Sequence, residues 1–134
     1  MRTTSTVALL LASLACHAET PQQIRQTYTA EAGSQPAGFT PSAKRGEVLF
    51  RQRFAINDKM PACTACHTDN PLSAGQHAVT GKTIRALAVA ANAERFSDPA
   101  KVEKWFGRNC KEVMGRACTA AEKADFVSYM SEVR

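Results

Sequence analysis

Two cysteines and a histidine stand close together near the middle of the chain, in the run CTACH at 63–67. The spacing of Cys63 and Cys66 places both thiols on the same face of one helical turn. There they can add to the two vinyl groups of a single haem, and His67 can present its imidazole to the iron. The run therefore predicts one covalently attached haem c, with Cys63 and Cys66 as its thioethers and His67 as an iron ligand.

Other chemistries of paired cysteines fit this chain less well. A zinc ribbon needs a second pair at the same spacing, and the remaining pair, Cys110 and Cys118, is spaced too widely. A thioredoxin-like redox pair needs a preceding strand in a βαβ unit, which the sequence does not indicate. The run GQHAVTGKT at 75–83 resembles a phosphate-binding loop, but it has one residue too many between its glycines.

The first residues have the features of an export signal. Arg2 supplies a positive charge, residues 7–15 are mostly apolar, and small residues precede a cleavage site after Ala18. We therefore expect residues 1–18 to be a signal peptide and residues 19–134 to form a single monohaem domain. Covalent haem attachment occurs after export, so a signal peptide agrees with the predicted haem site. The expected location is the periplasm.

A lipid anchor is the alternative fate of this segment. Cys16 would then carry the lipid, but Ser13 stands where a large aliphatic residue is expected before such a cysteine. No apolar run in the chain is as long as the roughly 18 residues that a membrane span needs, so we expect no membrane insertion.

The composition is that of one globular domain with a modest positive charge. The chain has 134 residues, of which 44% are hydrophobic and 22% charged, and its net charge is +5. This excess is too small and too dispersed to indicate nucleic-acid binding. It favours an acidic partner surface.

Helical signals dominate the sequence, and no alternating strand pattern is present, so the predicted fold class is all-α. The final helix starts at the capping box TAAE, 119–122. Helices are expected over 19–32, 42–54, about 98–110 and from 119 onward, with a partly helical, alanine-rich segment at 83–93.

Small and aromatic residues predict a crossing between the early helix and the last one. Gly46 and Phe50 share a face of the first, and Phe126 and Tyr129 share a face of the second. A glycine lets another backbone approach closely, and flanking aromatic rings fix the crossing. Class I cytochromes c close around their haem with such a crossing.

A sixth ligand of the iron must come from the chain after the haem motif. Met130 falls in the apolar stripe of the last helix and is expected in the core, and His77 follows His67 too closely to cross the haem. The remaining candidates are Met114 and the less usual Asn109. On the residues alone Met114 is favoured, because His/Met ligation is the common arrangement.

Two cysteines bracket a loop that contains Met114. In an oxidising compartment Cys110 and Cys118 are expected to form a disulfide. Closing this short loop would stabilise the fold by roughly 2.6 kcal/mol in the chain-entropy model. The bridge would also fix the geometry of the neighbouring candidate ligands.

Cations outnumber acids in the same segment. They form either a solvated helix face or a docking rim for an acidic redox partner. The aromatic pair Trp105 and Phe106 is expected to pack in the core or against the haem. The cations are Lys101, Lys104, Arg108, Lys111 and Arg116, against Glu103 and Glu112.

Four stretches of the chain carry a resemblance to a known family. They are CTACHT at 63–68, TGK at 80–82, ERFSD at 94–98 and the longest, KVEKWFGRNCKEVMGRACTAAEK at 101–123. On these residues the chain resembles the sphaeroides-type haem proteins, small exported class I cytochromes c, over most of its length from Thr40 onward. The resemblance implies the class I cytochrome c fold, His67 as proximal ligand, Asn109 as sixth ligand and a bridge between Cys110 and Cys118.

The resemblance also implies a function. It implies that the iron binds the diatomics O₂, NO and CO, and that a dihaem cytochrome c is the redox partner. An amide oxygen suits ferric iron better than ferrous iron, so Asn109 is expected to leave on reduction and open a coordination position. The alternative is an ordinary electron shuttle with a permanent His67/Met114 haem. A third reading, an enzyme acting on oxygen or nitric oxide, lacks a clear proton donor, since only His77 titrates near neutral pH.

Overall fold

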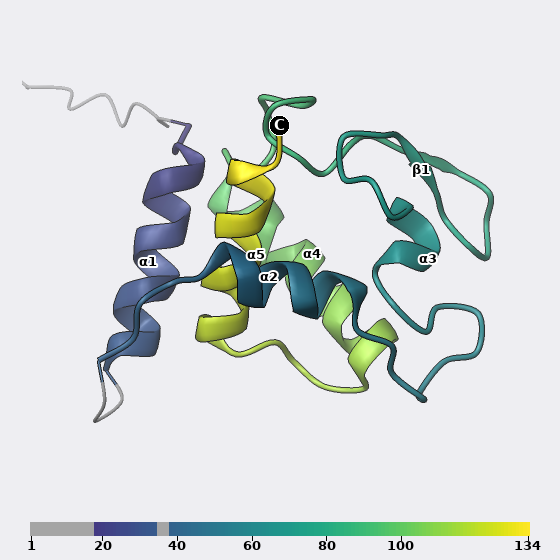
Figure 1. The fold of residues 1–134 in the computed structure, drawn as a ribbon, viewed down its shortest axis with the longest axis horizontal. Coiled ribbons are helices and arrows are strands. Elements are labelled where there is room, and N and C mark those ends of the chain that lie inside the picture. The colour runs from purple at the N-terminus through teal and green to yellow at the C-terminus, as the bar shows by residue number, and fades with distance from the viewer. Residues whose placement is uncertain (1–17, 35–37) are drawn as a thin grey trace, which may run out of the picture.

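The computed structural model describes residues 18–34 and 38–134, and helices form most of its regular structure (Figure 1). The predicted all-α class is confirmed, and the predicted signal peptide lies, except for Ala18, outside the described residues. Within the described ranges no helix is long and apolar enough to cross a membrane. The helices are α1 (Pro21–Gly33), α2 (Ala43–Arg51), α3 (Thr64–His67), α4 (Pro99–Met114) and α5 (Ala120–Glu132). Two short strands, β1 (Gly75–Gln76) and β2 (Thr83–Ile84), pair antiparallel, with Gly75 opposite Ile84.

Side chains cap the helices at the starts that the sequence predicts. The Thr20 hydroxyl accepts from the backbone N–H of Gln23 at 3.2 Å, and the Gln23 side chain accepts from the Thr20 N–H at 2.8 Å. Thr119 and Glu122 form the same reciprocal pair at the start of α5. Asp98 accepts from the first turn of α4, which begins with a proline. These bonds satisfy backbone donors that a helix start leaves without partners.

Two helix ends differ from the predicted ones. α2 ends at Arg51, short of the predicted 42–54, because the next residue turns to an extended conformation. α4 continues through Cys110 to Met114, beyond its predicted end. It stops where Gly115 takes a left-handed conformation, φ 71°, which favours glycine.

The alanine-rich segment 83–93 is not helical, so that expectation is wrong. After β2 it runs through turns, and long-range bonds replace helical ones. The N–H groups of Leu87 and Ala88 both donate to the carbonyl of Pro71, at 3.0 and 2.9 Å. Val89 donates to a carbonyl of α5 at 2.9 Å. The segment therefore fastens the chain after α3 to the C-terminal helix.

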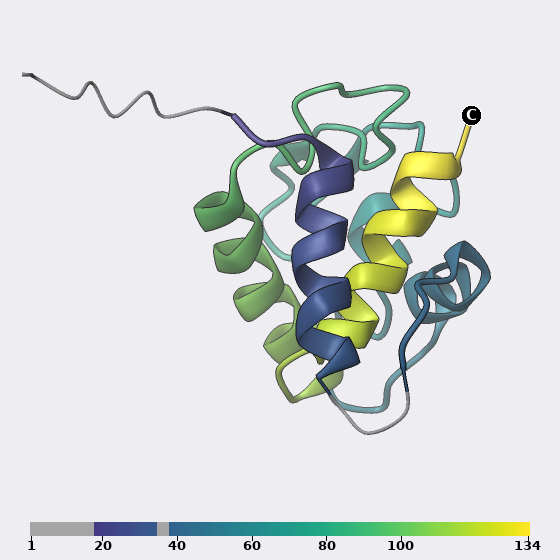
Figure 2. The same ribbon diagram turned by 90° about the vertical axis from the view of Figure 1, so that its left-hand side faces the viewer.

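α5 lies between α1 and α2 and packs against both (Figures 1 and 2). At the crossing with α2, a Cβ placed on Gly46 would overlap the backbone carbonyl of Asp125 and lie 2.9 Å from the Cβ of Tyr129. The Phe50 ring centroid is 5.9 Å from that of Tyr129 and 6.2 Å from that of Phe126. The predicted crossing between an early glycine and late aromatic residues is confirmed.

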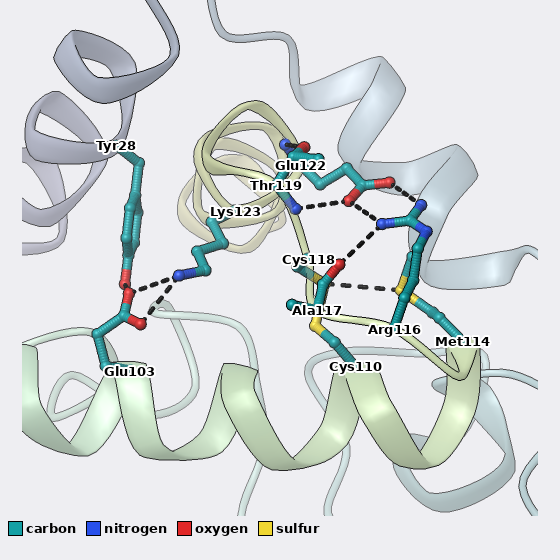
Figure 3. The surroundings of a disulfide bond; sticks show 10 residues. All are labelled: Tyr28, Glu103, Cys110, Met114, Arg116, Ala117, Cys118, Thr119, Glu122 and Lys123. Atoms are coloured by element: carbon teal, nitrogen blue, oxygen red, sulfur yellow. Dashed lines mark hydrogen bonds and ion pairs between the residues drawn. A yellow bond between two sulfur atoms is a disulfide. The ribbon is translucent and has the colours of Figure 1, made fainter.

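α4 is attached to α1 and α5 through side chains. The Phe106 ring centroid lies 5.9 Å from that of Tyr28 and 5.6 Å from that of Phe126. The Tyr28 hydroxyl donates to Glu103 at 2.5 Å, and Lys123 donates to both carboxylate oxygens of Glu103 at 2.8 and 2.9 Å (Figure 3). Burial, with Glu103 beside it, raises the pKa of Tyr28 far above its ordinary value. These contacts fix the position of α4, which carries the candidate sixth ligands.

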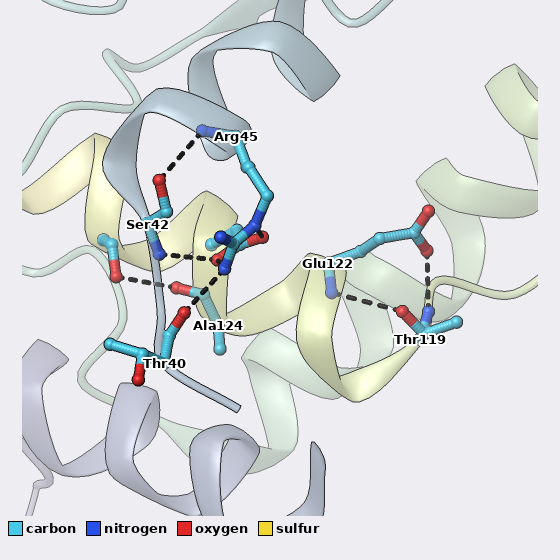
Figure 4. A network of polar contacts seen from close by, with 8 residues as sticks. Thr40, Ser42, Arg45, Thr119, Glu122 and Ala124 are labelled. Atoms are coloured by element: carbon cyan, nitrogen blue, oxygen red, sulfur yellow. Dashed lines mark hydrogen bonds and ion pairs between the residues drawn. The ribbon is translucent and has the colours of Figure 1, made fainter. Parts of the chain in front are cut away.

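A buried carboxylate locks the start of α2 to α5. Asp125 accepts from the Ser42 N–H at 2.6 Å and from Arg45 Nε and Nη2 at 2.7 and 2.9 Å. The same Arg45 Nη2 also donates to the carbonyl of Thr40 at 2.6 Å (Figure 4). Because its oxygens are fully engaged, Asp125 can be buried at this junction as a charged group.

Candidate haem site

The CTACH run forms one helical turn. Cys63 stands at the start of α3, and the N–H groups of Cys66 and His67 both donate to its carbonyl, at 3.3 and 3.1 Å. Thr68 ends the turn with φ 60°, a conformation that non-glycine residues seldom take. Cys63 and Cys66 are free thiols in this structure and lie one turn apart on the helix. This is the arrangement that addition to a single haem needs.

A glycine lets the following hairpin pack against this turn. A Cβ on Gly75 would overlap the backbone carbonyl of Cys66 and lie 3.0 Å from the Cα of His67. The N–H of Ala78 lies 3.2 Å from the Sγ of Cys66. β1 and the turn after it therefore back the attachment residues directly.

The chemistry of the donor residues fits a haem. Burial raises the pKa of Cys63 to about 11, so its thiol stays neutral until it is converted to an uncharged thioether. Burial, and secondarily the charge of Arg95, lowers the pKa of His67 to about 4. The imidazole is therefore neutral at physiological pH, which is the form that donates a lone pair to iron.

The thiols reach two different hydrophobic clusters. Cys63 packs against the main core between α1, α2 and α5. Cys66 packs against a second cluster formed by Met60, Cys110, Val113 and Met114. The attachment turn is therefore held between the helical core and the C-terminal half of α4.

Cys110 and Cys118 form the predicted disulfide, with an S–S distance of 2.01 Å and Cα atoms 5.6 Å apart. Because α4 extends beyond Cys110, the bridge joins a turn of α4 to the residue just before the cap of α5 (Figure 3). Met114 is 8% exposed, and its Sδ lies 3.6 Å from the Sγ of Cys118. Asn109 is half-buried and immediately precedes the bridged Cys110.

Comparisons with known proteins identify the family. A profile described as "Domain of unknown function (DUF1924)" matches residues 36–130. The "Cytochrome c-type protein SHP" of Cereibacter sphaeroides is 44% identical over 112 residues, 83% of this chain and 82% of that protein. Cytochrome c'' of Methylophilus methylotrophus is 40% identical over 96 residues, 71% of this chain and 67% of that protein. The chain belongs to the SHP-type cytochromes.

Solved structures of both relatives have the same fold. Oxidized SHP, described as an oxygen binding cytochrome c, matches with a TM-score of 0.77 and 41% identity, covering 85% of this chain and 97% of that one. The crystal structure of oxidized cytochrome c'' gives a TM-score of 0.77 and 36% identity, covering 85% and 94%. A solution structure of cytochrome c'', described as giving insights into haem-ligand detachment, gives 0.71 with the same identity and coverage. This SHP-type cytochrome thus has the class I cytochrome c fold and one covalent haem c.

Two residues that the sequence analysis set aside as sixth ligands have other roles in the structure. Met130 is fully buried, as predicted for a core residue. In this SHP-type cytochrome the Nδ1 of His77 accepts from the N–H groups of Val79 and Thr80, both at 3.2 Å. His77 therefore caps the turn that joins β1 to β2.

Trp105 is not packed in the core, so that part of the expectation is wrong, and packing against the haem stays a prediction. Its side chain is 40% exposed, and Lys104 Nζ and Arg108 Cζ lie 6.0 and 5.8 Å from its ring. Trp105 lies about 100° around the helix from Phe106, on a side of α4 that the core leaves exposed. Phe106 does pack against both clusters, as expected.

The cations on α4 and just after it are only partly neutralised. Arg108 pairs with Glu112 at 3.0 Å, and Arg116 pairs with Glu122 at 2.6 Å. Within the part of the chain that the structure describes, Lys101, Lys104 and Lys111 are exposed and form no ion pair. These three lysines remain available to an acidic surface.

One polar group near the site was missed by the sequence reasoning. Arg95 lies in the ERFSD stretch, is half-buried, and donates to the backbone carbonyls of Ala86 and Arg85. The apolar segment around 86–89, against which Arg95 packs, was the available signal for its burial. The composition of that segment suggested a helix instead. Only the fold brings this arginine back onto that segment.

Proposed function

We propose that this SHP-type cytochrome is an exported, periplasmic protein whose haem is held by Cys63 and Cys66, with His67 and Asn109 as axial ligands. Bound haem supplies an iron that changes between ferric and ferrous states and offers its sixth position to a small ligand. Asn109 leaves that position on reduction, so that O₂, NO or CO can enter. The protein thus combines electron transfer with binding of diatomic gases.

The observation that carries this proposal is the packing of Met114, the rival ligand. Its sulfur is buried in the second cluster against the Cys110–Cys118 bridge, at 3.6 Å from Cys118. Asn109 has no hydrogen bond from its side chain to any described residue and lies half-buried on the same helix. This packing supports the Asn109 amide, rather than the Met114 thioether, as the ligand that α4 would supply.

The chemistry of the amide explains the redox dependence. Its oxygen is a hard, neutral and weak donor, which binds ferric iron better than the softer ferrous iron. A thioether has the opposite preference. Once detached, the Asn109 amide N–H₂ can donate a hydrogen bond to an incoming diatomic ligand. The descriptions of SHP as oxygen-binding and of ligand detachment in cytochrome c'' support this behaviour for the present chain.

The electron donor in this proposal is an acidic cytochrome, specifically a dihaem cytochrome c. Its docking surface is the exposed face of α4, where Lys101, Lys104 and Lys111 carry unpaired charges among the described residues. Opposite charges on two such surfaces accelerate encounter and fix orientation.

The test is a comparison of Asn109→Ala and Met114→Leu in the haem-loaded protein. In the wild type we expect a six-coordinate ferric haem and a five-coordinate, high-spin ferrous haem that binds CO without displacing a strong ligand. Asn109→Ala should open the ferric site to water or added anions, whereas Met114→Leu should leave both spectra unchanged. A sulfur-to-iron charge-transfer band that is lost in Met114→Leu and kept in Asn109→Ala would establish the ordinary His/Met shuttle instead.

A further inference from the structure

Every backbone donor of the loop between β1 and β2 is used inside the chain. The loop, residues 77–82, is the central part of the stretch that resembles a phosphate-binding loop in sequence. Residues 78–82 are exposed, so water is available to their N–H groups. Each N–H group from His77 to Lys82 nevertheless donates to an acceptor of the protein. The partners of these donors therefore indicate what the loop conformation holds in place.

His77 takes part in most of the hydrogen bonds that close the loop. Its N–H donates to the carbonyl of Lys82 at 2.9 Å, and its carbonyl accepts from the N–H of Gly81 at 2.8 Å. Its Nδ1 accepts from the N–H groups of Val79 and Thr80, both at 3.2 Å. The Lys82 N–H donates to the Thr80 hydroxyl at 3.4 Å. The conformation of the loop thus depends mainly on His77.

The remaining donor of the loop points toward the haem motif. The N–H of Ala78 donates to the Sγ of Cys66 at 3.2 Å. Ala78 stands between His77 and Val79, so the hydrogen bonds on both sides of it fix the direction of this N–H. Sulfur is a weak acceptor, and an exposed peptide group without such support would turn to water instead. The side chain of His77 therefore supports a contact that His77 itself does not make.

The strands hold the loop within reach of Cys66. A Cβ on Gly75 would overlap the carbonyl of Cys66, so β1 lies directly against the turn that carries this cysteine. Gly75 also pairs with Ile84 across the hairpin. The hairpin is thus fixed at its base by close backbone packing and closed at its tip by His77.

We propose that His77 is a positioning residue, which aims the Ala78 N–H at the sulfur through which Cys66 is joined to haem. A thioether sulfur keeps its lone pairs, so it can accept this hydrogen bond after attachment as the thiol does before it. The inference rests on the proposed haem attachment at Cys66, and it does not depend on which residue is the sixth ligand.

The hydrogen bond bears on the redox equilibrium of the haem. Hydrogen bonds to the groups that hold a haem or a metal centre tune its potential. A donor on the thioether sulfur draws electron density from the edge of the haem, which favours the ferrous state with its additional electron. Loss of the bond should therefore shift the equilibrium toward ferric haem. A histidine that only stabilised the loop would change the free energy of unfolding without such a shift.

The first experiment measures the midpoint potential of the haem-loaded protein and its variants. His77→Leu removes the Nδ1 acceptor and should move the equilibrium about threefold toward ferric haem, a fall of about 28 mV at 59 mV per tenfold change for one electron. His77→Asn should restore most of the wild-type value, because an asparagine oxygen can accept from the N–H two residues ahead. The matched control is Thr80→Val, which removes only the acceptor of the Lys82 N–H and should leave the potential unchanged.

A second measurement follows the Ala78 N–H directly. In amide hydrogen exchange, resolved to single residues by fragmentation of the hairpin peptide in a mass spectrometer, this group should exchange slowly in the wild type and in Thr80→Val. It should exchange rapidly in His77→Leu. In resonance Raman spectra, deuteration of the amides should shift the C–S stretching band of the thioether in the wild type but not in His77→Leu.

The wild-type measurement decides the inference even if His77→Leu fails to fold. Rapid exchange of the Ala78 N–H in the haem-loaded wild type would overturn it, as would equal shifts of the potential in His77→Leu and Thr80→Val. A peptide that contains Cys66 without haem would overturn the proposed attachment, and this inference with it. Spectra showing another sixth ligand than Asn109, with the exchange and potential results intact, would overturn the proposed ligand set alone.

Discussion

The sulfur of Met114 lies 3.6 Å from the Sγ of Cys118, so the last residue of α4 is packed against the disulfide that closes the turn to α5. The bridge and the thioether therefore belong to one hydrophobic cluster, together with Met60 and Val113. Asn109 precedes this cluster on the same helix. The geometry of the candidate ligand consequently depends on a covalent constraint one residue away.

Replacing both bridge cysteines by serine should lower the free energy of unfolding by roughly 2.6 kcal/mol, because the unfolded chain regains the entropy of the closed loop. The haem should remain attached through Cys63 and Cys66. The end of α4 should become more mobile, which should reduce occupancy of the sixth position in ferric spectra. Denaturant titration and optical spectra of the variant measure these effects.

The wild-type protein supplies the control for this prediction. Cleavage of residues 1–18 removes Cys16, haem consumes the thiols of Cys63 and Cys66, and Cys110 and Cys118 are bridged, so the denatured mature protein should show no reactive thiol. Detection of thiols in the oxidised, denatured, haem-loaded protein would contradict the bridge.

Gly46→Ala should lower the free energy of unfolding by about 1–3 kcal/mol or more, because its Cβ would collide with the backbone of Asp125. Gly107→Ala is the matched control. It lies within α4 with no neighbouring atom within 4 Å of the added Cβ. It should stabilise the protein by roughly 0.5–1 kcal/mol through helix propensity. Equal effects of the two substitutions in denaturant titrations would count against close packing at the crossing.

Trp105→Ala should slow electron transfer from the acidic partner by roughly tenfold, because exposed tryptophans flanked by cations are strong interface contacts. The dependence on salt should be unchanged, since the substitution removes no charge. Lys104→Glu combined with Lys111→Glu should instead slow association most at low salt. Stopped-flow reduction of the ferric protein at several ionic strengths distinguishes the two effects. A wild-type rate that is independent of salt would refute electrostatic docking on α4.

Glu122→Gln should weaken the loss of unfolding free energy that occurs as the pH falls. The hydrogen bonds from Arg116, at 2.6 and 2.8 Å, are the main reason why the pKa of Glu122 lies below its ordinary value. A lowered pKa contributes stability above about pH 4.5 that is lost as the pH falls through the folded-state value. The pair is partly exposed, so this contribution is below about 1 kcal/mol.

Glutamine is the informative substitution at this position because it can still complete the capping box with Thr119. Unfolding free energies measured between about pH 3 and pH 7 should therefore converge in acid and differ at neutral pH. Parallel curves for the two proteins would show that the ion pair with Arg116 has no influence.

Local signals in the sequence were sufficient for much of this fold. The capping residues Thr20, Asp98 and Thr119 each act on their own helix, so a short stretch of sequence contains the whole interaction. The spacing of Gly46 and Phe50 likewise indicates which helix face must meet another backbone. The CTACH run indicates its chemistry because attachment requires only residues within one turn.

Other features depend on contacts between distant segments. The segment 83–93 has a helical composition, but its N–H groups bond to Pro71 and to α5, which no local pattern encodes. The exposure of Trp105 depends on which side of α4 meets the core. Arg95 is half-buried only because the chain returns onto Ala86.

The crossing at Gly46 also bears on the order in which the protein is made. Its contacts are with Asp125 and Tyr129, which are synthesised well after both Gly46 and the CTACH run. A chain produced from its N-terminus cannot close this crossing until α5 is complete, whereas the CTACH run is finished earlier. The cysteines of that run are therefore accessible in an open chain before the helices join. Haem attachment can precede closure, and α5 then closes the crossing around a haem that is already bound.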